Sequence, residues 1–285
     1  MLQSGDRIGL VACSNPLPDA ERGRIDLLCD RLSDLGLVPV LSDCLFAAEQ
    51  PRSDPDARAA ALMRCYADGD LRSIFDLSGG DLANELLSRL DWALIRANPK
   101  PFWGYSDLTV LLNAIWQMTG QPGRLFQLRT LVGEDGAAQT RRFVDSAFGG
   151  SDELFSADWR FVQGEQMEGI LVGGNLRCLL KLAGTRYLPD FTGRLLFLEG
   201  LHGGIPQLVT HLSQLKQMEV FDRIAGLMLG TFTQLEETLS PVAVGQLVAE
   251  VISRPALPIA KTQQVGHGPA SRCLNIGGFY RLTRD

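Results

Sequence analysis

The first half of this chain alternates short apolar runs with longer amphipathic stretches, and this alternation limits the possible folds more than any other feature. Runs that favour buried strands occur at 7–12, 37–41, 73–77 and 101–105. Stretches with the apolar spacing of helices occur at 19–35, 55–67, 82–90 and 107–118, with a shorter one at 92–96. Strands that alternate with helices build βαβ units, so we predict an α/β domain with a mostly parallel sheet.

The composition changes near residue 149, where Gly149-Gly150-Ser151-Asp152 is followed by Gln163-Gly164-Glu165. Clusters of glycine and polar residues are typical of connections. We therefore predict an N-terminal α/β domain at 1–148, a linker at 149–168 and a C-terminal domain at 169–285. The predicted strands of the C-terminal domain are 169–172, 194–198 and 225–230, and its predicted helices are 208–218 and 241–252. A cleft between the two domains would hold the active site.

Charge and residue content exclude several classes of function. A net charge of −6 and the absence of a lysine or arginine block argue against nucleic acid as a partner. No apolar run reaches the length of about 20 residues that a membrane span needs, and none resembles a secretory signal. The six cysteines show no C-x-x-C pair, and the three histidines show no metal-binding spacing. We expect a cytoplasmic protein without a metal or another cofactor.

Ser106 stands where the predicted strand 101–105 turns into the predicted helix 107–118. This context is typical of the nucleophile elbow of serine hydrolases, in which the turn exposes the hydroxyl and N–H groups of the helix start face the reaction. Gly104 would relieve crowding at such a turn. The alternative is that Ser106 or Asp107 only caps the helix, as both residue types often do.

A serine hydroxyl needs a base, and two histidines lie in glycine-flanked loops. His267 lies in Gly-His-Gly-Pro, and His202 lies between Leu201 and two glycines, so the residues alone leave the choice open. His211 falls in a predicted helix and is expected to be structural. Glu199 ends the strand 194–198, at the edge where open α/β sheets bind ligands, and could orient the histidine.

Six short motifs, in the same order along nearly the whole chain, resemble those of the L,D-carboxypeptidase family of serine peptidases, which includes muropeptide L,D-carboxypeptidases and microcin C7 immunity peptidases. They are residues 5–14, Gly79-Gly80, Gly104-Tyr105-Ser106-Asp107, Gly173-Gly174-Asn175-Leu176, Leu196-Phe197-Leu198-Glu199 and Gly266-His267-Gly268. The last motif favours His267 over His202 as the base.

The resemblance implies a Ser-His-Glu triad of Ser106, His267 and Glu199, divided between an N-terminal α/β domain and a β-rich C-terminal domain of the swivelling type. It also implies an oxyanion hole formed by the N–H groups of Gly80 and Asp107. The implied activity is release of a terminal D-amino acid from an L-centre in cell-wall peptides, as part of peptidoglycan recycling. A muropeptide-like peptide would be the substrate, and the protein would act as a homodimer without a cofactor.

Two segments depart from the family's pattern. Ser78 stands before the glycine pair where an arginine is usual, and residues 124–129 replace a His-Gly-Pro segment. We expect both to lie near the substrate, with Ser78, Gly79, Arg124 and Arg129 in substrate binding. An arginine could hold the free carboxylate that a carboxypeptidase recognises.

Three other functions fit parts of the sequence. An immunity-type peptidase that cleaves peptidyl-nucleotide amides would need an aromatic platform, for which Trp159 is the candidate. A catalytically silent α/β ligand-binding protein would keep the cleft without turnover. A cysteine amidotransferase-like enzyme would need cysteine at the elbow, where this chain has Ser106.

Overall fold

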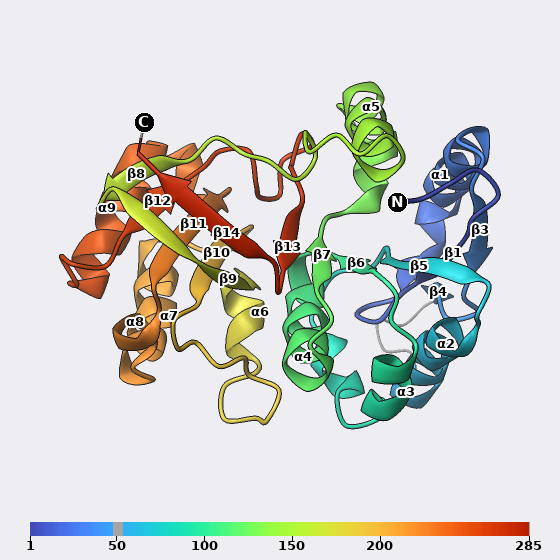
Figure 1. The fold of residues 1–285 in the computed structure, drawn as a ribbon, viewed down its shortest axis with the longest axis horizontal. Coiled ribbons are helices and arrows are strands. Elements are labelled where there is room, and N and C mark those ends of the chain that lie inside the picture. Colours follow the sequence, from blue (N-terminus) through green and yellow to red (C-terminus); the bar gives the residue numbers. More distant parts are fainter. Residues whose placement is uncertain (48–53, 285) are drawn as a thin grey trace.

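A computed structural model describes residues 1–47 and 54–284 as two α/β domains that lie side by side (Figure 1). The first sheet has the order β13-β7-β6-β5-β1-β3. Its strands are β1 (Arg7–Val11), β3 (Val38–Leu41), β5 (Leu71–Asp76), β6 (Phe102–Gly104), β7 (Gly123–Leu125) and β13 (Leu274–Ile276). All neighbours pair in parallel except β13 and β7. The apolar residues of β1 and β5 are buried, as their sequence predicts.

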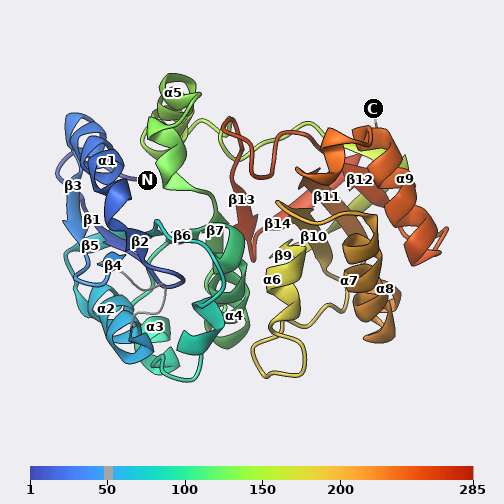
Figure 2. The same cartoon turned by 180° about the vertical axis from the view of Figure 1, so that it is seen from behind.

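Helices cover both faces of this sheet (Figures 1 and 2). They are α1 (Arg22–Asp34), α2 (Pro55–Ala67), α3 (Trp92–Ala97), α4 (Thr109–Thr119) and α5 (Gly136–Ala147). The short 3-10 helices of this half are η1 (Asp19–Glu21), η2 (Ala83–Leu86), η3 (Ser106–Leu108) and η4 (Leu128–Val132). A separate two-stranded pair joins β2 (Leu17–Pro18) to β4 (Phe46–Ala47).

The second sheet has the order β14-β9-β10-β11-β12-β8, with parallel pairs in its centre and antiparallel strands at both edges. Its strands are β8 (Arg160–Gln163), β9 (Gln166–Asn175), β10 (Leu195–Gly200), β11 (Gly226–Phe232), β12 (Ile259–Lys261) and β14 (Phe279–Thr283). Its helices are α6 (Leu176–Leu180), α7 (Ile205–Gln217), η5 (Leu235–Glu237), α8 (Val220–Arg223) and α9 (Pro241–Ile252). The predicted two-domain α/β class, with a mostly parallel sheet in the N-terminal domain, is confirmed. In the described residues, no helix has the length and apolar content that a membrane crossing requires.

Helix α4 joins the two domains, because residues Thr109–Ile115 are all buried between them. Asn113 exchanges two hydrogen bonds of 2.8 Å with the backbone of Gly173, and the Asn175 N–H donates to Thr109 Oγ1 at 2.9 Å. These bonds fix the end of β9 against the helix that follows Ser106. The two halves of the site therefore meet across a hydrogen-bonded seam.

Several sequence expectations need correction or addition. Residues 82–90 do not form an α-helix beyond the 3-10 turn η2, because their local hydrogen bonds join residues three apart, from the Glu85 N–H to the Leu82 carbonyl and from the Leu87 N–H to the Asn84 carbonyl. The Ala83 N–H, at the start of this turn, donates to the Asp107 carboxylate. Strand β8 and the start of β9 lie inside the predicted linker 149–168. Strand β13, which falls in the predicted C-terminal domain 169–285, pairs with β7 in the first sheet. The domain boundaries given above stay a prediction.

Candidate active site

Ser106 lies on a tight turn directly after β6 and Tyr105. Its φ is +54°, a left-handed conformation that is unusual for a residue with a side chain and costs about 1–3 kcal/mol. A Cβ on Gly104 would lie 2.6 Å from the Leu108 Cβ, so only glycine lets the turn close this tightly. No side chain caps η3, so the capping role considered for Ser106 and Asp107 does not apply.

Gly79 and Gly80 follow β5 on the neighbouring strand, beside the Ser106 turn. Gly80 has a φ of +115°, and a Cβ there would lie 2.2 Å from Asn15 Oδ1. The same Asn15 oxygen accepts from the Asp81 N–H at 2.8 Å, while the Asn15 N–H donates to Gly79 O at 3.1 Å. The loop is thus held with its backbone close to Ser106, as its glycine pair predicts.

Glu199 and His267 form a buried pair at the carboxyl edge of the second sheet. Glu199 is the penultimate residue of β10 and is fully buried, and its Oε2 lies 2.7 Å from His267 Nδ1. Because a carboxylate accepts, we assign a proton to Nδ1. Nε2 is then the basic nitrogen, and this buried atom has no hydrogen-bond partner among the described residues.

Two further residues hold this pair in place. Asn175 Nδ2 donates to Glu199 Oε1 at 3.0 Å, and the Tyr105 hydroxyl donates to Oε2 at 3.3 Å. Burial and the nearby Glu199 charge raise the pKa of Tyr105 well above its usual value, so the hydroxyl keeps its proton as a donor. The Tyr105 ring also packs edge-on against His267, with ring centroids 4.9 Å apart.

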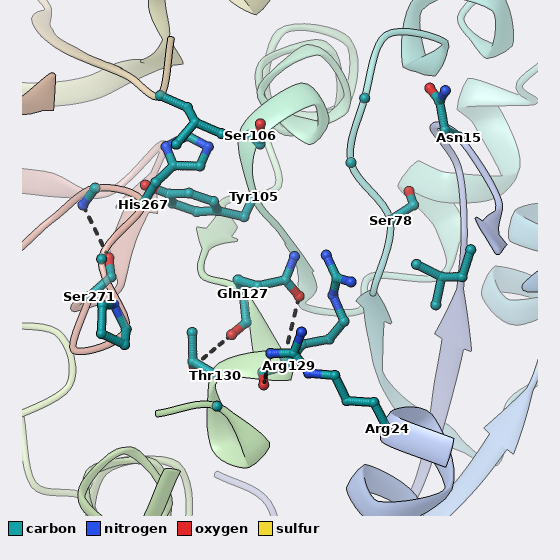
Figure 3. A pocket seen from close by; sticks show the side chains of 18 of the residues that line it. Asn15, Arg24, Ser78, Tyr105, Ser106, Gln127, Arg129, Thr130, His267 and Ser271 are labelled. Carbon is teal, nitrogen blue, oxygen red and sulfur yellow. Dashed lines mark hydrogen bonds between the residues drawn. The ribbon is translucent and has the colours of Figure 1, made fainter. Parts of the chain in front are cut away.

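Both halves of the site face one cavity of about 660 Å³ between the domains (Figure 3). Ser106, His267 and Tyr105 lie at one end, whereas Arg24 and Arg129 lie across the cavity from them (Figure 3). A second cavity of about 290 Å³ also reaches Ser106 and Gly80, and includes Glu199, His202 and His211 in its wall. Ser106 therefore lies where the two cavities approach each other.

The structure brings most of the predicted substrate residues to the large cavity, but in different ways. Gly79 lines it with backbone, and Arg129 lines it with a guanidinium that pairs with Glu21 at 3.4 Å. Burial and the neighbouring Arg24 lower the pKa of Arg129. Ser78 also lines the cavity, but its side chain is fully buried and its Oγ donates to Asp76 Oδ1 at 2.5 Å.

Two expected residues lie away from the cavities at Ser106. Arg124 does not reach the substrate cavity, because the register of β7 turns its guanidinium over the rings of Trp103 and Phe155, in a separate cavity. Trp159 is not a platform in either cavity at Ser106, because its indole packs edge-on against Phe197 in the core.

Sequence reasoning missed Arg24, Tyr105 and Asn175 as residues with a place in the site. Tyr105 and Asn175 lie inside motifs that the family resemblance singled out, so a signal was present. Arg24 is one of many charged residues on helix α1, and nothing in the sequence distinguishes it. Among the described residues, no group of three or more histidine, cysteine or acidic side chains is placed to hold a metal ion.

Matches to known families place this two-domain chain in a class of hydrolytic serine carboxypeptidases. Residues 8–125 match the family described as the LD-carboxypeptidase N-terminal domain, and residues 168–282 match the LD-carboxypeptidase C-terminal domain. The chain therefore belongs to the LD-carboxypeptidase family, as its motifs suggested.

Individual relatives agree with this assignment. A Bacillus subtilis protein named "Probable murein peptide carboxypeptidase" is 31% identical over 97% of this chain and 88% of its own length. The microcin C7 self-immunity protein MccF of Escherichia coli is 24% identical over 97% of this chain and 90% of its own length. The crystal structure of a muramoyltetrapeptide carboxypeptidase from Oxalobacter formigenes shares the fold, with a TM-score of 0.81, 24% identity and coverage of 98% and 95%.

Proposed function

We propose that this carboxypeptidase uses Ser106 as nucleophile, His267 as general base and Glu199 as the residue that orients the base. The observation that carries this proposal is the 2.7 Å contact between Glu199 and His267 Nδ1, which leaves Nε2 unpartnered at the end of the cavity where Ser106 lies. A serine hydroxyl becomes an effective nucleophile when such a base can take its proton. The strained turn exposes that hydroxyl to the cavity.

The reaction follows from these roles. Ser106 Oγ attacks the scissile carbonyl carbon while its proton passes to His267 Nε2, and Glu199 stabilises the imidazolium. The backbone N–H groups of Gly80 and Asp107 are the proposed donors to the oxyanion, each worth about 3–4 kcal/mol in such sites. The imidazolium then protonates the leaving amine as the C–N bond breaks. Water hydrolyses the acyl-enzyme by the same proton transfers in reverse.

For the substrate, we propose a cell-wall-derived peptide from which a terminal D-amino acid is released at an L-centre. The name of the Bacillus subtilis relative supports a murein peptide. Arg129 and Arg24 offer two guanidinium groups on the cavity wall, and both contact the Glu21 carboxylate, at 3.4 and 3.7 Å, as their one acidic partner among the described residues. Such a pair suits the free α-carboxylate of the residue to be released.

A peptidyl-nucleotide is the second candidate, because MccF is among the relatives and its structure has been determined with glutamyl sulfamoyl guanosine. Against this candidate, Trp159 is half-buried against Phe197 and lines neither cavity at Ser106, so it does not offer the platform that this substrate was expected to need.

One assay separates these functions. Release of free amino acid is measured from a panel of muropeptides and peptidyl-nucleotides, together with labelling by a fluorophosphonate probe. We expect probe labelling that depends on Ser106, and cleavage of the muropeptides. Cleavage of peptidyl-nucleotides alone would favour the second candidate. A protein that is neither labelled nor active would favour the third function considered, that of a catalytically silent ligand-binding protein.

A further inference from the structure

The Asp107 carboxylate, beside the proposed nucleophile, is fully buried and has three close partners. Its Oδ2 accepts from the Ser14 hydroxyl at 2.6 Å and from the Ala83 N–H at 2.9 Å. Its Oδ1 accepts from the Lys181 ammonium at 2.5 Å. This side chain takes no part in the triad, since the proposed role of Asp107 in the reaction belongs to its backbone N–H.

The first two contacts join the segments that carry the proposed oxyanion donors. Ala83 lies three residues after Gly80, and Ser14 Oγ also accepts from the Leu82 N–H at 3.3 Å. The Asp107 carboxylate thus connects the end of the glycine loop to the turn that holds Ser106. A movement of this carboxylate would change the distance between the N–H groups of Gly80 and Asp107.

The positive charge that contacts this carboxylate comes from the other domain. Lys181 follows α6, and its side chain is only 17% exposed. Its ammonium also donates to the Asp81 carbonyl at 2.9 Å, one residue after Gly80. A buried carboxylate is costly without a compensating charge, so removal of the ammonium would favour a movement of Asp107 toward water.

The segment that carries Lys181 contacts the other half of the site as well. Asn175, the N-cap of α6, donates to Glu199 at 3.0 Å. Arg177 donates to the Gly80 carbonyl at 3.2 Å. One short stretch of the second domain therefore touches the orienting carboxylate, the glycine loop and, through Lys181, the nucleophile turn.

We propose that Lys181 is a positioning residue that fixes the oxyanion hole through the Asp107 carboxylate, so that the hole is complete only when the second domain is docked. This inference rests on the proposed function of Ser106, Gly80 and Asp107. Lys181 need not touch the substrate. Its loss is expected to weaken binding of the transition state more than binding of the ground state.

The test compares Lys181→Met, Lys181→Gln and Lys181→Arg with the full-length wild type on one accepted peptide. Removal of an oxyanion donor costs about 10²–10³ in kcat, and displacement should cost less, so we expect Lys181→Met to lose about 10–100-fold in kcat with KM within about threefold. The fluorophosphonate labelling rate should fall in parallel, because its phosphoryl oxygen also occupies the hole. Lys181→Arg keeps the cation and should recover part of the lost kcat. The kcat of Lys181→Gln should lie between those of Lys181→Met and Lys181→Arg.

Lys216→Met is the matched control, because this exposed lysine of α7 contacts only the Val251 carbonyl, at 3.4 Å, among the described residues. It should leave both rates unchanged. Wild-type kcat in a folded Lys181→Met or Lys181→Gln protein would overturn the inference, and so would a raised KM at constant kcat. If Lys181→Met does not fold, the kcat and KM of Lys181→Gln and Lys181→Arg provide the same test. A wild-type protein that neither cleaves nor labels would instead refute the proposed function.

Discussion

The two domains build their halves of the site in different ways. The first domain uses mainly backbone: Ser106 has a φ of +54° and Gly80 a φ of +115°, and buried carboxylates hold the turns around them. The second domain uses side chains, since His267 and Asn175 are each hydrogen-bonded to the Glu199 carboxylate. The first half therefore depends on conformations that only certain residues tolerate, and the second on the chemistry of particular groups.

This difference predicts how each half fails. A substitution in the backbone-built half, apart from removal of the Ser106 hydroxyl itself, should disturb geometry, with graded effects on rate and stability. A substitution in the side-chain half should remove a chemical function and leave the fold largely intact.

The largest effect is expected from Ser106→Ala or His267→Ala. Because triad members act as a unit, each should lower kcat by about 10⁴–10⁶, and the double variant should be no slower than either alone. Steady-state and single-turnover assays of amino acid release measure this. Losses that multiply in the double variant would show that the two residues act independently, which would break the proposed coupling between the domains.

Glu199→Gln should have the next largest effect, a loss of about 10²–10⁴ in kcat, because the amide cannot stabilise the imidazolium. The melting temperature should change little, since the side chain keeps its shape. Tyr105→Phe is the control within the same cluster: it removes the hydroxyl, with its 3.3 Å hydrogen bond to Glu199, keeps the ring, and should cost less than about tenfold. Equal losses in both variants would mean that Glu199 acts only through packing.

Amidation of the terminal carboxyl of an accepted peptide should lower kcat/KM by about 10²-fold or more, since a charge-assisted contact is lost. Arg129→Gln should remove most of this discrimination by slowing the free acid alone. Arg124→Gln is the matched control, because Arg124 lies in a separate cavity. Equal cleavage of the free and amidated peptides would exclude a carboxypeptidase and favour an endopeptidase or esterase.

The sequence predicted those parts of the site that depend on a pattern of neighbouring residues. The turn at Ser106 follows from a strand, a glycine and a helix within a few residues, and the glycine pair at Gly79 marks the next loop. The pairing of Glu199 with His267, which are 68 residues apart, came from the family resemblance. Spacing alone could not choose between the two glycine-flanked histidines.

The remaining features depend on packing between distant segments. Arg124 was placed wrongly because strand register decides which face of β7 its side chain occupies. The predicted helix at 82–90 is a 3-10 turn instead, with local bonds between residues three apart, and its first N–H group, that of Ala83, donates to Asp107 from a distant segment. Lys181 gave no signal, since an isolated lysine after a short helix is usually a solvated residue.

The smallest effect is expected from His202→Ala, which we predict to keep kcat within about threefold of wild type. His202 has the same glycine-rich surroundings as His267, but it is exposed in the wall of the small cavity, whereas His267 is nearly buried against Glu199. An imidazole without an orienting carboxylate is a poor general base for a serine, because its tautomer and direction are not fixed. The same peptide assay as for His267→Ala makes the two variants directly comparable. A loss in His202→Ala as large as in His267→Ala would assign the base to the small cavity, and the pairing of Glu199 with His267 would then be structural only.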